Sequence, residues 1–197
     1  MVIGLTGRYC AGKGIAARVL ADRGFTVIDA DALSHDVLTE RAADVIAQFG
    51  PGVRAPGGGV DRRALGRIVF PDPTAQSKLQ AILYPGITER ILRIISETRG
   101  HVVIDAPLLQ RAGLQRICNA VVFVRAPALL RLVRAMRRDA LPLRDAWARV
   151  NAQKDVRPQL NGPPVDTYTV RNWGSKRSLE LRIARLAPRL RGRETHG

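Results

Sequence analysis

The chain has 197 residues, of which 46% are hydrophobic and 5% aromatic, and its 32 basic and 17 acidic side chains leave a formal net charge of +15. This length suits one main domain with room for an inserted subdomain. No apolar run approaches the roughly 18 residues that a membrane span requires. We therefore expect a globular, cytoplasmic protein with no membrane partner, and the sequence predicts no oligomeric state.

The positive charge attracts polyanions such as nucleotides. The basic residues are spread along the chain instead of being gathered in one tail, which disfavours a nucleic-acid partner. Cys10 and Cys118 fit neither a disulfide framework nor a CxxC spacing, so both thiols are expected to be reduced. The histidines form no cluster with cysteines or acids at ligand spacing, and no zinc site is predicted.

Short apolar runs alternate with segments of helical spacing along most of the chain. The predicted strands are residues 2–6, 25–28, 101–104, 120–124 and 167–170. The predicted helices are residues 15–23, two or more segments between 33 and 49, and residues 62–70, 75–98, 129–138, 143–154 and 175–191. Pro71, Pro73 and Pro85 are expected to break helices or to occupy first-turn positions.

Strands that alternate with helices predict right-handed crossovers and an α/β fold with a parallel, doubly wound, five-stranded sheet. Residues 32–99 contain no predicted strand. We therefore expect a core made of residues 1–31 and 100–197, interrupted by a helical insertion over residues 32–99.

A complete G-x-x-x-x-G-K pattern follows the first strand and opens a helix. In such a P-loop, backbone N–H groups and the helix N-terminus surround phosphate oxygens, and the lysine supplies a positive charge. Gly14 stands where Ser or Thr usually binds magnesium, so the metal would be held by substrate phosphates, water and carboxylates. The residues expected to bind ATP in this loop are Gly7, Arg8, Tyr9, Cys10, Ala11, Gly12, Lys13 and Gly14.

The same stretch offers a second interpretation. Residues 12–17 match G-x-G-x-x-A, and Asp29 ends the second strand where a dinucleotide-binding fold places its ribose-binding acid. Against it, Gly12 comes five residues after Gly7, which is a longer loop than a tight dinucleotide-binding turn requires. No Tyr-x-x-x-Lys pair follows. A glycine-rich turn without any ligand is a third interpretation.

Eight segments in order resemble the dephospho-CoA kinase family over nearly the whole chain. They are LTGRYCAGK, VIDAD, DRRALGRIVF, LYPGI, DAPLL, RAMRRDAL, ARVNAQ and VRNWGS. The resemblance implies a P-loop kinase core, a helical CoA-binding domain over residues 32–99, and a mobile helical lid over about residues 134–157. It also implies ATP-dependent phosphorylation of the ribose 3′-hydroxyl of dephospho-CoA, the last step of CoA biosynthesis, with ATP and Mg²⁺ as cofactors.

By this resemblance, Asp31 matches the second aspartate of the family's D-A-D and would act as general base on the attacking hydroxyl, a role that phosphoryl transfer to a weakly acidic alcohol calls for. Asp29 is expected to be structural, and helix capping is the alternative for either aspartate. Lys13 would contact the transferred phosphate. Asp105 ends a strand and would reach Mg²⁺ through water, with a helix cap or a turn as the alternative.

Arg134 and Arg138 resemble the lid arginines that close over the phosphates, and Arg131 lies one turn earlier at helical spacing. A solvated charged helix face is the alternative for these arginines. Asn172 resembles the family's position beside the adenine. Further matches to the family's lid helix and late N-x-G motif are Arg149, Gln153 and Gly174.

The resemblance places substrate contacts at Arg62, Arg63, Tyr84, Pro107 and Leu108. Tyr84 replaces the histidine that usually precedes Pro85, and Gln110 and Arg111 stand where Phe and Glu are common. Two other functions remain open from the sequence: a P-loop kinase for another small hydroxyl or nucleotide acceptor, and a basic nucleotide- or nucleic-acid-binding module without catalysis.

Overall fold

A computed structural model describes residues 1–107, 109, 113–153, 156 and 165–192. The chain divides into two compact units. The first unit comprises Met1–Ile28 and Thr98–Gly197, and the second comprises Asp29–Glu97.

A five-stranded sheet in the order β2-β3-β1-β4-β5 forms the centre of the first unit. Parallel ladders join β1 to β3, β1 to β4 and β4 to β5. Because the chain proceeds to both sides of β1, the sheet is doubly wound, and the predicted α/β class is confirmed. The strands are β1 (Val2–Gly7), β2 (Thr26–Asp29), β3 (Val102–Asp105), β4 (Ala120–Arg125) and β5 (Asp166–Arg171).

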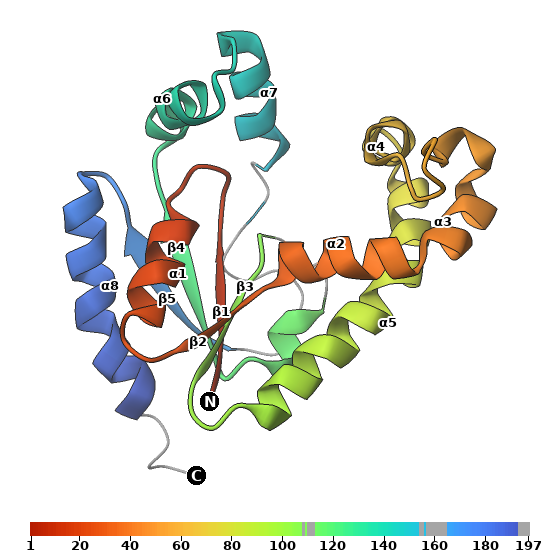
Figure 1. Cartoon of the computed structure of the whole chain (residues 1–197). Helices are drawn as coiled ribbons and strands as arrows, with labels where there is room; N and C mark the ends of the chain where they lie inside the picture. The colour runs from red at the N-terminus through yellow and green to blue at the C-terminus, as the bar shows by residue number, and fades with distance from the viewer. Residues whose placement is uncertain (108, 110–112, 154–155, 157–164, 193–197) are drawn as a thin grey trace. The chain divides into compact units, whose positions relative to one another are not determined.

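The core of this unit lies between the sheet and two helices, α1 (Lys13–Ala21) and α8 (Lys176–Arg191). These helices lie side by side (Figure 1) and pack on each other. Strand residues such as Ile3 and Leu5 are fully buried, as the continuous apolar runs predict for strands covered on both faces. On the two helices, Leu20 and Ile183 belong to the same buried cluster.

Three further helical segments complete the described part of the first unit. They are η2 (Leu114–Ile117), α6 (Ala128–Asp139) and α7 (Leu143–Ala152). α6 and α7 pack against each other.

The second unit is helical, apart from an isolated β-bridge between Arg54 and Val60. α2, α3 and α4 each pack on the long helix α5. α5 continues through Pro85, where the sequence predicted a break or a first-turn position. Proline removes one helical hydrogen bond, but Leu83 and Ile87 on either side are buried and hold the helix in place. The elements are α2 (Ala30–Glu40), α3 (Ala42–Phe49), η1 (Pro51–Val53), α4 (Arg62–Val69) and α5 (Pro73–Glu97).

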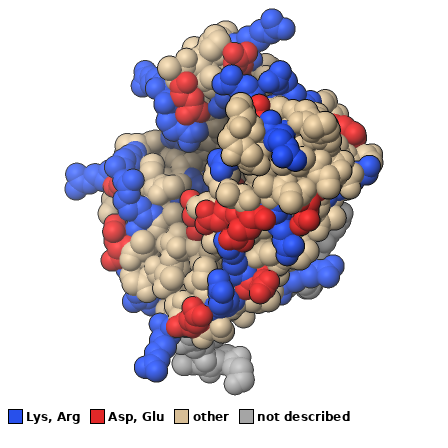
Figure 2. Space-filling view, turned by 45° about the vertical axis from the view of Figure 1, so that its right-hand side comes forward, with Lys and Arg blue, Asp and Glu red and all other residues tan. Residues whose placement is uncertain are grey.

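The surface carries charges of both signs. Figure 2 shows Lys and Arg side chains scattered over the viewed face, with Asp and Glu among them. Cys10 and Cys118 are both free thiols, as expected. Within the described residues, no helix combines the length and apolar character that crossing a membrane requires.

Candidate functional site

The glycine-rich loop connects β1 to α1, with Gly7 as the last residue of the strand and Lys13 as the first of the helix. Gly12 has a φ of +109°, and a Cβ atom at this position would lie 2.5 Å from Nδ2 of Asn172. Both observations require glycine. Cys10 also has a positive φ, +57°. The loop therefore turns tightly before the helix, as phosphate-binding loops do.

Asn172 holds the loop in place from within the first unit. Its side chain is 4% exposed, and its Nδ2 donates a hydrogen bond to the carbonyl of Ala11 at 2.7 Å. Its backbone N–H donates to the carbonyl of Arg125 at the end of β4, also at 2.7 Å. The sequence resemblance assigned Asn172 to the adenine. Its observed contacts connect the loop to the carboxyl end of β4, and the contact with the adenine stays a prediction.

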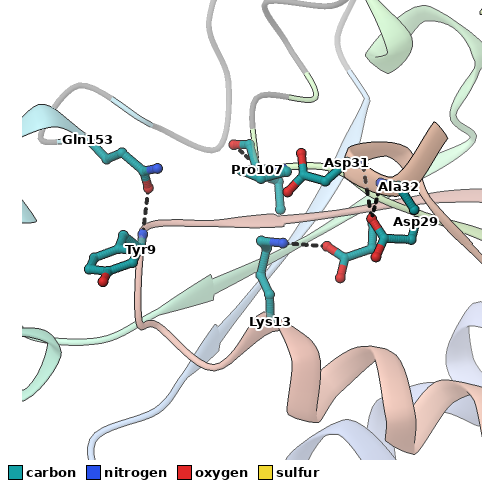
Figure 3. A network of polar contacts seen from close by, with 9 residues as sticks. Tyr9, Lys13, Asp29, Asp31, Ala32, Pro107 and Gln153 are labelled. Atoms are coloured by element: carbon teal, nitrogen blue, oxygen red, sulfur yellow. Dashed lines mark hydrogen bonds and ion pairs between the residues drawn. The ribbon is translucent and has the colours of Figure 1, made fainter. Parts of the chain in front are cut away.

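Lys13 and Asp105 form an ion pair, with 2.5 Å between Nζ and Oδ1 (Figure 3). Their side chains are only 19% and 16% exposed. The pair follows from the topology, since β1 and β3 are neighbours in the sheet and their carboxyl ends meet at one edge. This edge, where the strand order reverses, is where open α/β sheets bind ligands. Beside it, the hydroxyl of Thr6 donates to the carbonyl of Pro107 at 3.1 Å.

Gly14 lies in the first turn of α1 and is exposed. A Cβ atom at this position would have no atom within 4 Å apart from its chain neighbours and the backbone of α1. The missing hydroxyl is therefore not a consequence of crowding. Across the described residues, no group of three His, Cys, Asp or Glu side chains gathers that could hold a metal ion alone.

A polar network joins the loop to α6 and α7. The hydroxyl of Tyr9 donates to Asp139, and Arg138 donates to the same carboxylate from Nε and Nη2 at 2.7 and 3.0 Å. The Arg138 guanidinium lies 5.1 Å from the Tyr9 ring centroid, a cation–π distance. Arg149 contributes a further ion pair to Asp139 at 3.6 Å.

This network shifts the acidity of its members. Hydrogen bonds from Arg138 and then from Tyr9 lower the pKa of Asp139 to about 2. The hydrogen bond to Asp139 raises the pKa of Arg138 above its usual range. Burial, and next the bond to Asp139, raise the pKa of Tyr9. Asp139 is therefore ionised, and Arg138 and Tyr9 are protonated, at neutral pH.

Two more contacts come from residues after α7. The backbone N–H of Tyr9 donates to Oε1 of Gln153 at 2.5 Å (Figure 3), and Nε of Arg8 donates to the carbonyl of Val156 at 3.0 Å. The loop is thus in contact with α6 and with the end of α7 at the same time.

Arg134 binds the segment after β5. Its Nη2 donates to the carbonyl and to Oδ1 of Asn172, at 3.4 and 3.3 Å, and to the carbonyl of Gly174 at 3.3 Å. Asn172 is therefore hydrogen-bonded both to Arg134 and to Ala11 of the loop.

The remaining predicted residues lie in the second unit. Oδ1 of Asp29 accepts hydrogen bonds from the N–H groups of Asp31 and Ala32, at 2.9 and 3.1 Å (Figure 3), so Asp29 caps α2. Asp31, in the first turn of α2, is exposed. Arg62 and Arg63 are exposed at the start of α4.

Tyr84 lies on α5 and lines a hollow of about 720 Å³. The other lining residues are Ser77, Gln80, Ala81, Pro85, Thr88, Glu89 and Leu92.

The structure thus brings together, within the first unit, the loop, Lys13 with Asp105, and the arginines of α6. Leu108, together with Gln110 and Arg111, lies outside the described residues. Sequence reasoning missed Asp139, whose only signal was its place directly after Arg138 in the motif RAMRRDAL. The phenol of Tyr9 as a link to α6 was also missed, because the contact joins residues 130 positions apart.

The chain is also similar to known proteins. A sequence model of the dephospho-CoA kinase family matches residues 1–162. Dephospho-CoA kinase from Moorella thermoacetica is 41% identical over 167 residues, which cover 81% of this chain and 79% of the relative.

Two solved structures are also similar. The protein TT1252 from Thermus thermophilus has a TM-score of 0.79 and 27% identity, with 96% of this chain and 97% of the other covered. Dephospho-CoA kinase from Campylobacter jejuni has a TM-score of 0.62 and 25% identity, with 97% of both chains covered.

Proposed function

Because the chain belongs to the dephospho-CoA kinase family, we propose that it transfers the γ-phosphoryl group of ATP to the ribose 3′-hydroxyl of dephospho-CoA, giving CoA and ADP. The observation that supports this most directly is the tight loop from Gly7 to Lys13, with Lys13 paired to Asp105 at the ligand-binding edge of the sheet. A bond forms between the 3′-oxygen and the γ-phosphorus, and the bond from that phosphorus to the β-γ bridging oxygen breaks.

In this proposal the loop N–H groups and Lys13 bind the nucleotide phosphates. The ammonium group of Lys13 exchanges part of its contact with Asp105 for phosphate oxygens when ATP binds. Arg138 and Arg134, on one face of α6, neutralise the charge that spreads over the equatorial oxygens during transfer. Asn172 keeps the loop in its bent form, and residues 134–157 act as the lid.

Asp31 is the proposed general base, which takes the proton of the 3′-hydroxyl as the new bond forms. It lies in the first turn of α2 and is exposed. Asp29, whose carboxylate is occupied by two backbone N–H groups, has a capping role instead. The dephospho-CoA side would be bound in the second unit, with Arg62 and Arg63 meeting its phosphates and Tyr84 positioning it, and by Pro107 and Leu108.

Asp105 would hold Mg²⁺ together with substrate phosphates and water. The donor set fits this ion, because Mg²⁺ usually keeps several waters and takes only one or two carboxylates beside the phosphates. When bound, the ion neutralises phosphate charge. Asp105 itself orients Lys13 and keeps a negative group beside it.

The direct test is release of ADP by the purified protein with and without dephospho-CoA, followed by a panel of acceptors. We expect release that depends on dephospho-CoA and a product phosphorylated on the ribose 3′ position. A preference for a nucleoside monophosphate or a sugar would favour a different acceptor. ATP binding without any turnover would contradict the proposal.

Asp31 is tested with a matched pair of variants. Asp31→Asn removes the proton acceptor and is expected to lower kcat by about 100-fold or more, with little change in the KM for ATP. Asp29→Asn keeps an effective helix cap and is expected to keep kcat within a few fold of the unmodified protein. Near-normal turnover of Asp31→Asn would remove Asp31 from the mechanism.

A further inference from the structure

Among the arginines of α6, only Arg131 is buried, with 2% of its surface exposed. Its Nε and Nη1 atoms have no hydrogen-bond partner within the described part of the chain. A guanidinium group has five N–H donors and no acceptor, and it stays charged at any physiological pH. Leaving such a group buried and unpaired is costly, and native proteins pair buried charges.

The charged groups that act on Arg131 belong to the phosphate-binding loop. Its pKa is lowered, first by burial and then by the positive charge of Arg8, and the thiol of Cys10 opposes this shift. Burial raises the pKa of Cys10, and the positive charge of Arg131 is among the influences that lower it. Arg131 is therefore close enough to the loop to be affected by the charges of Arg8 and Cys10.

The other arginines of the same face differ in this respect. Arg138 is neutralised by Asp139, and Arg134 donates to two carbonyls and an amide oxygen of the chain. Arg134 nonetheless keeps its Nη1 buried and without a partner in the described residues. The buried donors of α6 without a partner in the described residues thus belong to Arg131 and Arg134, whereas Arg138 is paired with Asp139.

We propose that Arg131 forms an additional anion-binding subsite for the phosphate chain of the nucleotide. This rests on the proposed function, because the ligand is the ATP that the kinase uses. The planar fork of Arg131 can meet two phosphate oxygens at once. It also supplies positive charge to a loop that lacks the usual hydroxyl at Gly14.

The test uses the full-length protein and ATP alone, without any acceptor. Arg131→Gln is expected to weaken ATP binding, measured by titration calorimetry, by about 10-fold, the size of one lost charge-assisted contact. Adenosine, which has no phosphate, is expected to bind the variant as it binds the unmodified protein. Arg137→Gln, an exposed position on the same helix, is the control and is expected to change neither ligand.

Thermal unfolding separates ligand binding from a structural role. Because the removed charge is buried and unpaired, the variant without ligand is expected to have the same or a higher Tm than the unmodified protein. The rise in Tm on adding ATP is expected to be smaller. Arg131→Met, which keeps an apolar body of similar length, is expected to behave in the same way and provides a second variant if the glutamine variant does not fold.

ATP affinity within twofold of the unmodified protein in either folded variant would overturn the subsite. Equal weakening of ATP and adenosine would also overturn it, as would a lowered Tm in both variants with the ATP-induced rise unchanged. None of these measurements uses dephospho-CoA. A result that overturns the subsite therefore does not bear on the proposal that dephospho-CoA is the acceptor. Conversely, an inactive protein that still binds ATP through Arg131 would contradict only the proposed reaction.

Discussion

Gly14 stands where the P-loop pattern usually has a hydroxyl, and the structure leaves open space at that position. A Cβ atom there would lie in the first turn of α1, next to Lys13, with no atom of another element within 4 Å. The magnesium contact that a hydroxyl would supply must therefore come from Asp105, phosphates and water in the proposed reaction. This single residue makes the loop better suited to binding phosphate than to holding the metal.

Gly14→Ser is expected to restore that contact. The hydroxyl can reach the metal from the usual place, so the Mg²⁺ concentration that gives half-maximal turnover should fall by about 5-fold, the effect of one added metal ligand of modest strength. The measurement is initial rate against free Mg²⁺ at saturating ATP.

Gly14→Ala is the matched control for this substitution. It fills the same space without a hydroxyl and should leave the Mg²⁺ dependence unchanged. Both substitutions should raise the free energy of unfolding by about 0.5–1 kcal/mol, because glycine in a helix is less favourable than a residue with a side chain. An equal shift in Mg²⁺ dependence for both variants would argue against a metal contact.

At the level of elements, α6 connects the loop to α7 through one carboxylate. Asp139, the last residue of α6, accepts from Tyr9 and Arg138 and pairs with Arg149 of α7. A single side chain therefore positions one proposed catalytic arginine against the loop and also joins two helices of the proposed lid.

Asp139→Asn is expected to lower kcat by about 10-fold, since the neutral amide no longer holds Arg138 in the orientation that transfer needs. The KM for dephospho-CoA should change by less. Steady-state kinetics measures both. Asp145→Asn, an exposed carboxylate in the first turn of α7, is the control and should leave both constants as they are. Equal losses in the two variants would indicate a general charge effect.

The same carboxylate has a defined pH dependence. Its pKa in the folded protein is about 2, below the ordinary value of 3.8, so the interactions of Asp139 favour the folded state fully above pH 4 and are lost as the pH falls toward 2. Between pH 5 and 9 the carboxylate stays ionised. A kcat profile over this range should therefore be the same in shape for the unmodified protein and Asp139→Asn. A break present only in the unmodified protein would contradict this assignment.

For the whole molecule, the net charge of +15 is the dominant long-range property. Like charges at this density repel one another in the compact state more than in the expanded chain, and salt screens that repulsion. The described ion pairs, such as Arg90 with Glu40 and Lys176 with Glu180, involve exposed carboxylates and contribute little each. Screening should therefore stabilise the protein more than it weakens these pairs.

We expect the Tm of the ligand-free protein to rise by a few degrees between 20 and 300 mM NaCl, where the Debye length falls from roughly 20 to roughly 6 Å. Differential scanning calorimetry measures this. Sucrose at equal osmolality controls for effects other than screening. A Tm that falls with NaCl would show that the ion pairs outweigh the repulsion.

Much of the fold could be predicted from the sequence because its signals are local. Four apolar runs and a weaker fifth segment predicted five strands, and the loop pattern after the first run predicted the turn that Gly12 makes. Pro85 was the exception, since packing of Leu83 and Ile87 keeps α5 continuous across it. The proposed catalytic role of Asp31 came from resemblance and stays a prediction.

The sequence by itself determined the strand, loop and helix that surround Lys13, because glycine positions and apolar periodicity act between near neighbours in the chain. Only the tertiary structure decided that Lys13 pairs with Asp105, that Tyr9 reaches Asp139 and that Arg131 is buried with two donors unpaired among the described residues. These contacts depend on which strands are neighbours and on how α6 packs, and burial turns an ordinary arginine of a basic helix into a charge that requires an anion.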